Sequence, residues 1–102
     1  AGNTLYISGT LGLDADGEVP AAVDVEARNV LNNIRGQLQD AGMTMDDLVL
    51  VQVYCSDVAF YDTFNEVYRT YFSAEFPARA FLGSGTLLRG ARFEVMGIAV
   101  DH

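Results

Sequence analysis

Two charged residues interrupt apolar stretches near the end of the sequence. Arg79 stands in "EFPARAFLGSG" (75–85), and Glu94 stands in "RFEVMGIAV" (92–100). An arginine offers a planar fork of N–H donors that suits a carboxylate, and a glutamate can act as a base or orient a water molecule. If neighbouring strands bring the two side chains together, they form a compact site for a small anion. The structural alternatives are a surface arginine with its stem laid along the protein, and a solvated glutamate on an outer strand face.

Other nucleophiles and metal ligands are scarce in this chain. Cys55 is the single cysteine, so no internal disulfide can form, and we expect it to be a packed strand residue rather than a nucleophile. His102 is the single histidine and the last residue, which excludes a histidine-based triad and a His/Cys metal cluster. Any chemistry must therefore rely on arginine, carboxylates, hydroxyls and backbone groups, without a metal.

The charge balance argues against a nucleic-acid partner. Fourteen acidic and six basic residues give a net charge of −8, and all six basic residues are arginines. Proteins bind nucleic acids largely by neutralising phosphates, which this balance opposes. Three of the arginines, Arg79, Arg89 and Arg92, make the C-terminal segment locally basic, so a small anion can still be attracted there.

Nothing in the sequence points to a membrane or to export. No apolar run approaches the roughly 20 residues of a membrane-spanning helix, and no charged region followed by an apolar block opens the chain. We therefore expect a cytoplasmic protein without a membrane partner. The chain does not begin with methionine, and we expect a further N-terminal segment before residue 1.

Hydrophobic periodicity predicts the elements of the N-terminal half. Alternating side chains over 4–9 predict a strand, and the stretch 11–19, with its Asp-Gly turn, predicts a hairpin. From about residue 21 the apolar residues follow the three-and-four spacing of an amphipathic helix. We expect Gly42 to end this helix as its C-terminal cap.

The second half predicts a strand, a helix and two more strands. The stretch 47–57 is apolar at nearly every position, which predicts a strand covered on both faces. Asp57 can cap a following amphipathic helix, and strands are expected over 78–88 and 91–100. The order ββαβαββ predicts a single α+β domain over 1–102, with a mixed sheet of five to six strands and two helices on one face.

This layout leaves one face of the sheet uncovered. Two helices can cover one face of such a sheet, yet the strands at 48–55 and 91–100 carry apolar residues on both faces. Soluble monomers avoid large exposed apolar patches. We therefore predict a closed homo-oligomer in which sheets of different subunits pack together.

Three blocks of the sequence together resemble one known family. "YISG", "AGMTMDDLVLVQVYCSDVAFYDTFNEVYRTYF" and "FPARAF…FEVMGIAV" look like the reactive-intermediate deaminase family (RidA, also called the YjgF or UK114-type family), in order and spacing over essentially the whole chain. The resemblance implies a homotrimer of the chorismate-mutase-like fold with three clefts between subunits. It also implies hydrolysis of 2-enamino and 2-imino acids, such as 2-aminoacrylate, to 2-keto acids and ammonia, without metal or organic cofactor.

The resemblance also implies roles for five residues. Arg79 matches the arginine that grips the substrate carboxylate, and Glu94 matches the glutamate that positions or activates the attacking water. Ser8 and Gly9 match the Ser-Gly motif that lines the cleft. Phe81 occupies a position where many members have cysteine, and its backbone N–H would help bind the carboxylate.

Other matched positions are structural or depart from the family pattern. Asn65 and Tyr68 match an Asn-x-x-Tyr helix motif, which we interpret as more structural than catalytic, with Asn65 a possible cleft residue. Thr10, another possible cleft residue, stands where glutamine is common. The bulk of Phe81 would reshape the pocket, and a family tyrosine that often closes the cleft lies before residue 1.

Three alternative functions follow from the same resemblance. The trimer could be a non-catalytic binder of small carboxylates or a chaperone-like regulator, or it could deaminate a larger enamine of the 2-aminomuconate type. Ribonuclease activity has been attributed to family members, but the net charge of −8 and the absence of lysine oppose it here.

Overall fold

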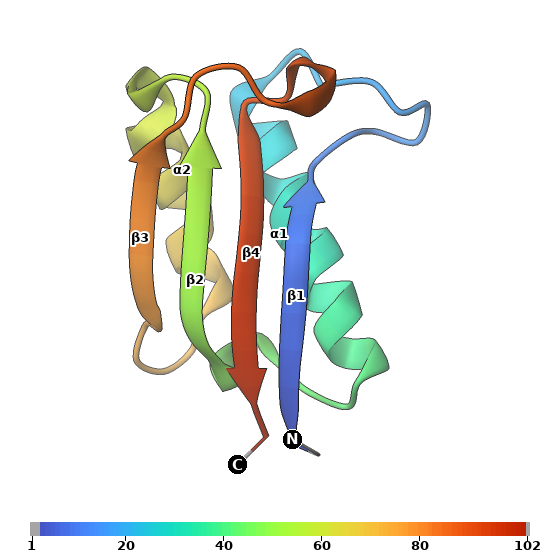
Figure 1. Cartoon of the computed structure of the whole chain (residues 1–102), viewed down its shortest axis with the longest axis vertical. Helices are drawn as coiled ribbons and strands as arrows, with labels where there is room; N and C mark the ends of the chain where they lie inside the picture. Colours follow the sequence, from blue (N-terminus) through green and yellow to red (C-terminus); the bar gives the residue numbers. More distant parts are fainter. Residues whose placement is uncertain (1–2, 102) are drawn as a thin grey trace.

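The computed structural model describes residues 3–101 as a four-stranded sheet with both helices on one face (Figure 1). The elements are β1 (Thr4–Leu11), α1 (Val23–Asp40), β2 (Leu48–Cys55), α2 (Tyr61–Tyr68), β3 (Ala78–Gly83) and β4 (Phe93–Val100). The strand order is β1-β4-β2-β3, with β4 antiparallel to both neighbours and β2 parallel to β3. The predicted α+β class, with a mixed sheet and two helices on one face, is confirmed. His102 lies outside the described residues.

The prediction of five to six strands in the order ββαβαββ is wrong, because the hairpin expected at 11–19 does not form. The predicted turn forms. The backbone N–H of Gly17 donates a hydrogen bond to the carbonyl of Asp14 at 3.0 Å, and Gly17 has a φ of +79°. The chain leaves the sheet at Gly12, where a Cβ would lie 2.3 Å from the carbonyl oxygen of Glu26. This close approach to α1 directs the segment away from the sheet, so the turn closes a loop instead of joining two strands.

Two local signals for the helices are confirmed, the glycine after α1 and the capping aspartate ahead of α2. Gly42 follows α1 with a φ of +75°, a left-handed conformation that glycine adopts without steric cost. Asp57 accepts a hydrogen bond from the backbone N–H of Ala59 at 2.9 Å, capping the short 3₁₀ turn that leads into α2. Neither helix of the described chain combines the length and apolar character needed to cross a membrane. The core between helices and sheet includes the following side chains: Ala27, Val30, Leu31, Ile34, Leu38, Val51, Val53, Phe64, Phe93 and Val95.

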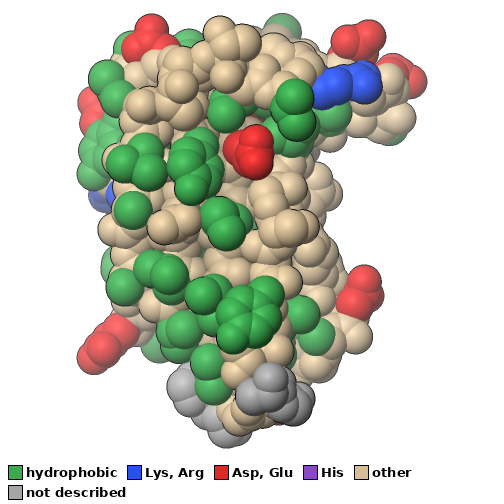
Figure 2. All heavy atoms as spheres, in the orientation of Figure 1, with side chains coloured by type: hydrophobic (Ala, Val, Ile, Leu, Met, Phe, Trp, Pro, Cys, Tyr) green, Lys and Arg blue, Asp and Glu red, His purple; other side chains and the backbone are tan. Residues whose placement is uncertain are grey.

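The face of the sheet opposite the helices is bare. Along β4 the buried Phe93 and Val95 alternate with Glu94 and Met96, which point to the uncovered side. Figure 2 shows hydrophobic side chains spread over this face with a single acidic side chain among them, and Glu94 is the only acidic residue in the four strands. The pairing of the strands puts these apolar residues on the bare face: Tyr6, Leu50, Tyr54, Leu82, Met96 and Ile98.

One charged pair is buried within the fold. Glu26 in the first turns of α1 is fully buried, and its Oε1 lies 2.8 Å from Nη1 of Arg92. Its Oε2 accepts hydrogen bonds from the backbone N–H groups of Arg92 and Phe93 at 2.8 and 3.3 Å. Arg92 also donates to the carbonyls of Pro20 and Ala21 at 2.9 and 3.0 Å. The network joins the start of α1, the loop before it and the start of β4.

Candidate active site

Arg79 lies on the edge strand β3 with its side chain on the helix side of the sheet. It pairs with Val51 of β2, which is buried against the helices. Its guanidinium carbon is 4.6 Å from the ring centroid of Tyr68, 5.5 Å from that of Phe81 and 5.8 Å from that of Tyr61. Tyr61 and Phe81 also pack edge to face, with centroids 4.8 Å apart. We call these three rings the aromatic cage.

The aromatic cage holds Arg79 without neutralising it. Rings attract a guanidinium through their π faces, so their contacts leave its N–H groups available for an anion. Nη1 of Arg79 is buried and has no hydrogen-bond partner among residues 3–101, and no carboxylate of this range pairs with the side chain. A buried, unpartnered charged donor is costly unless a ligand satisfies it. Arg79 is therefore held against α2 with an unsatisfied donor, unlike the surface residue that was the alternative.

An open pocket of about 460 Å³ adjoins Arg79, between α2 and the start of β3. Its walls are formed by Asn65, Tyr68, Arg69, Phe76, Pro77 and Arg79. Asn65 thus lies beside Arg79, as expected for a cleft residue. Tyr61 of the cage was not among the predicted site residues, although positions 61, 65 and 68 follow the spacing of one helix face, which could have revealed it.

Glu94 lies on the opposite, bare face of the sheet, next to the Ser-Gly motif. A Cβ on Gly9 would lie 2.1 Å from Oε2 of Glu94, so the carboxylate occupies space that only glycine leaves free. The pairing of β1 with β4 shifts register between Ile7 and Thr10, and Ser8 and Gly9 lie within this irregularity. Gly9 and Glu94 are therefore in contact within one chain, and Ser8 is the residue next to Gly9.

Arg79 and Glu94 are not brought together within one chain. Strand β2 lies between β3 and β4, which separates the two strands by roughly 10 Å. Arg79 pairs with Val51 of β2, whereas Glu94 pairs with Tyr54 of the same strand. These two positions on β2 are three residues apart, which adds an offset of roughly 10 Å along the strand direction. The side chains also point to opposite faces. The compact site that would form if neighbouring strands brought the two side chains together is absent from the single chain.

Thr10 follows the Ser-Gly motif, but its side chain points away from Glu94. Its hydroxyl donates to the carbonyl of Ser8 at 3.0 Å and accepts from the side-chain amide of Gln37 on α1 at 3.1 Å. These bonds direct Thr10 toward the helix side. They support the backbone beneath Ser8 and give Thr10 a positioning role.

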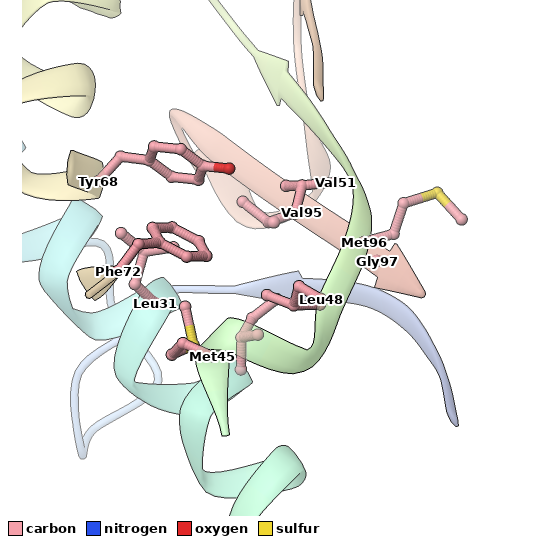
Figure 3. A pocket seen from close by; sticks show the side chains of 10 residues that line it. Leu31, Met45, Leu48, Val51, Tyr68, Phe72, Val95, Met96 and Gly97 are labelled. Atoms are coloured by element: carbon pink, nitrogen blue, oxygen red, sulfur yellow. The ribbon is translucent and has the colours of Figure 1, made fainter. Parts of the chain in front are cut away.

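The hydroxyl of Tyr68 has no hydrogen-bond partner among the described residues. Figure 3 shows it pointing between helix and sheet toward Val51 and Val95, and the surrounding side chains leave no room for a water molecule. Burial raises the pKa of this hydroxyl to about 12, against an opposing effect of the nearby Arg79 charge. Tyr68 thus contributes its ring to the aromatic cage, while its hydroxyl has no hydrogen-bond partner among the described residues.

Replacing Tyr68 with phenylalanine should stabilise the folded protein by about 1–2 kcal/mol at neutral pH, because it removes an unsatisfied buried hydroxyl. The difference in unfolding free energy between Tyr68→Phe and the parent should increase above about pH 10. An unfolded tyrosine ionises near pH 10, whereas Tyr68 retains its proton to about pH 12 when folded. Between these values the unfolded state binds fewer protons, so the parent loses stability as the pH rises. Urea unfolding of both proteins at about pH 8 and about pH 11 measures the effect.

The matched control is Tyr71→Phe, which removes a hydroxyl that donates to Oδ1 of Asn32 at 2.7 Å. This variant should be no more stable than the parent. A Tyr68→Phe variant that is less stable than the parent at both pH values would contradict the description of Tyr68.

Cys55 is a packed residue, as predicted. It is fully buried, and its Sγ donates to the carbonyl of Asp57 at 3.0 Å. Burial raises the pKa of the thiol, which disfavours the nucleophilic thiolate. Within residues 3–101, no group of three or more His, Cys, Asp or Glu side chains could hold a metal ion.

Comparison with known proteins agrees with the fold and with the sequence resemblance. The family model described as Endoribonuclease L-PSP matches residues 1–101. A 2-iminobutanoate/2-iminopropanoate deaminase of Bos taurus is 42% identical over 100 residues, covering 96% of this chain and 73% of the relative. The Homo sapiens protein of the same name is 36% identical with the same coverage.

Solved structures of RidA and YjgF proteins have the same fold as this chain. The YjgF gene product of E. coli has a TM-score of 0.91 at 32% identity, covering 98% of this chain and 82% of that one. E. coli TdcF with bound serine has a TM-score of 0.93 at 30% identity, covering 99% of this chain and 83% of that one. RidA from the Antarctic bacterium Psychrobacter sp. has a TM-score of 0.93 at 32% identity, with coverage of 99% and 83%. The chain therefore belongs to the Endoribonuclease L-PSP family, which is the RidA/YjgF family indicated by its sequence blocks.

Proposed function

We propose that this protein hydrolyses reactive 2-imino and 2-enamino acids, such as 2-aminoacrylate, to 2-keto acids and ammonia. The observation that carries the proposal is the unpartnered Nη1 of Arg79, held in the aromatic cage beside an open pocket. A planar guanidinium binds a carboxylate through two parallel hydrogen bonds. Relatives named 2-iminobutanoate/2-iminopropanoate deaminase act on acids of this kind.

The reaction needs the anion fixed, a water molecule aimed and a proton moved. Arg79 binds the carboxylate next to the C=N bond, and the backbone N–H of Phe81 on the same edge strand adds a donor. An enamine such as 2-aminoacrylate first gains a proton at C3 and loses one from nitrogen, which gives the imine. Glu94 then takes a proton from the water as the water oxygen attacks the C=N carbon, and it passes this proton to the nitrogen. The resulting carbinolamine collapses to the C=O group and releases ammonia, so one water is consumed per imine. A positioned acid/base typically contributes about 10²–10⁴-fold to such a step.

Ser8 and Gly9 form the wall of the cleft around Glu94, and Asn65 forms part of the wall around Arg79. In this proposal Gly9 leaves room for the Glu94 carboxylate, and Ser8 offers a hydroxyl to the water or to the developing amine. Thr10 supports Ser8 from behind through its hydrogen bond to the Ser8 carbonyl.

The complete site lies between subunits in this proposal. Arg79 of one copy and Glu94 of another must meet, because within one chain they lie on opposite faces with β2 between their strands. The bare apolar face, which includes the 71% exposed Tyr6, gives the copies a surface on which to associate. We propose a homotrimer with three clefts. Light scattering that finds a monomer at micromolar concentration would refute this assembly.

The test of the activity couples the purified protein to an amino-acid oxidase that releases 2-imino acids. Semicarbazide traps the imine before spontaneous hydrolysis, and the semicarbazone absorbs light. The proposal predicts that adding the protein lowers the rate of semicarbazone formation in proportion to its concentration. An unchanged rate would contradict deamination, and tight binding of 2-keto acids without turnover would favour the non-catalytic carboxylate binder instead.

Two alternative functions also follow from the family resemblance. A deaminase for a larger enamine of the 2-aminomuconate type differs in substrate only, and Phe81 is the residue that discriminates between the two. Cleavage of RNA, which the description of the family model names, finds no support in a chain of net charge −8. A cytoplasmic location is part of the proposal.

A further inference from the structure

Two of the six arginines have no partner within residues 3–101. Four arginines donate hydrogen bonds to other residues of the chain: Arg28, Arg35, Arg89 and Arg92. Arg69 and Arg79 make neither a hydrogen bond nor an ion pair in this range, although acidic residues outnumber basic ones by fourteen to six. Free arginines in so acidic a chain are notable, because carboxylates are abundant for pairing.

The two free arginines line the same pocket. Arg69 and Arg79 both border the space of about 460 Å³ between α2 and β3. Asn65 and Arg69 are four residues apart along the helical segment, so they are neighbours on one helix face. Three of the six lining residues therefore carry N–H donors, and no carboxylate is among them. Glu66, the acidic neighbour on α2, lines a different depression beside Arg28.

This pocket offers more than a small monocarboxylate requires. A substrate such as 2-aminoacrylate has three carbons and one anionic group. Arg79 satisfies that group, which leaves Arg69 without a partner. A second carboxylate on the same substrate would satisfy both.

We propose that Arg69 is a second anion-binding group and that the substrates include 2-imino and 2-enamino dicarboxylates. This inference rests on the proposed function, since it assigns Arg79 to the carboxylate beside the imine and Arg69 to the distal carboxylate. Arg69 is exposed, so its contribution is smaller than that of the caged Arg79. A charge-assisted hydrogen bond of this kind corresponds to about a tenfold change in affinity.

Equilibrium binding of two product acids tests the inference without turnover. Isothermal titration calorimetry at low salt compares 2-oxoglutarate, a dicarboxylate, with 2-oxobutanoate, a monocarboxylate. The parent should bind 2-oxoglutarate about tenfold more tightly. Arg69→Gln should bring the ratio of the two dissociation constants close to one, and Arg69→Lys should retain part of the preference because it keeps the charge but not the fork.

The control is Arg35→Gln, which removes an exposed arginine remote from this pocket that stacks on Tyr71 at 5.1 Å. It should keep the preference of the parent. A parent without preference, or a preference that persists in Arg69→Gln, would overturn the inference.

Turnover separates this inference from the proposed function. The semicarbazide assay is repeated with 2-iminoglutarate from glutamate oxidase and with 2-iminobutanoate. Hydrolysis of the monocarboxylate alone, with no preference in binding, overturns the second anion site and leaves the deaminase intact. A dicarboxylate preference in binding, without hydrolysis of either imine, supports the site and overturns the proposed function.

Discussion

Replacing Arg79 with glutamine should lower kcat/KM for 2-iminobutanoate by about 10²–10³-fold. Glutamine keeps a polar side chain but loses the charge and the fork that bind a carboxylate in parallel hydrogen bonds. Truncating one partner of a buried, hydrogen-bonded charge pair costs about 2–5 kcal/mol, and each 1.4 kcal/mol is about tenfold in rate. The semicarbazide assay measures the loss, and the melting temperature of the variant shows that it is folded.

Two variants define the cause of this loss. Arg79→Lys retains the charge but not the planar stacking against Tyr68 or the forked donors, so its activity should lie between those of parent and Arg79→Gln. Arg35→Gln removes an equally charged residue outside the pocket and should leave activity unchanged. An Arg79→Gln variant with more than about half of the parental kcat/KM would refute carboxylate binding by Arg79.

Replacing Glu26 with alanine should cost about 3–5 kcal/mol of unfolding free energy, because it leaves the guanidinium of Arg92 without its buried counterion. The backbone N–H groups of Arg92 and Phe93 would also lose their acceptor. Folded proteins are stable by only about 5–15 kcal/mol, so the loss is a large fraction of the total. Urea unfolding at one fixed protein concentration measures it, since an oligomer gains stability with concentration.

The matched control is Asp24→Ala in the same helix. Asp24 pairs with Arg28 at 2.7 Å, but both side chains are about half exposed, so its removal should have a much smaller effect. If Glu26→Ala does not fold, Glu26→Gln keeps a side-chain acceptor without the charge and should show an intermediate loss. Equal stabilities of Glu26→Gln, Asp24→Ala and the parent would contradict the importance of the buried pair.

Local features of the fold were predictable because local residues determine them. The apolar stripe of α1, the glycine after it and the Asp57 cap are set by residues within one or two turns of each other. The resemblance covered the whole chain and identified the family. Glu26 was missed even though it lies four residues before the buried Val30, within the apolar stripe, where a charge signals a buried partner.

Long-range features could not be predicted in the same way. Strand periodicity placed Glu94 mid-strand, but the order β1-β4-β2-β3 depends on pairings between residues far apart in the chain. Only that order separates Arg79 from Glu94 by an intervening strand. The hairpin at 11–19 failed for a related reason, because the close contact of Gly12 with α1 is invisible in the local sequence. The resemblance to the family had implied clefts between subunits, and this topology supports the proposal that Arg79 and Glu94 meet there.

Complementation between two inactive variants tests the composite site most directly. Arg79→Gln and Glu94→Gln chains are co-expressed with different tags, and the mixed assembly is purified through both tags and assayed for 2-imino acid hydrolysis. In a doubly tagged trimer of either composition, one of the three clefts combines the intact Arg79 of one variant with the intact Glu94 of the other, so about a third of parental activity should return in the purified assemblies. Each variant alone should be nearly inactive. Mixed assemblies that are no more active than the separate variants would contradict a cleft built from Arg79 and Glu94 of different subunits.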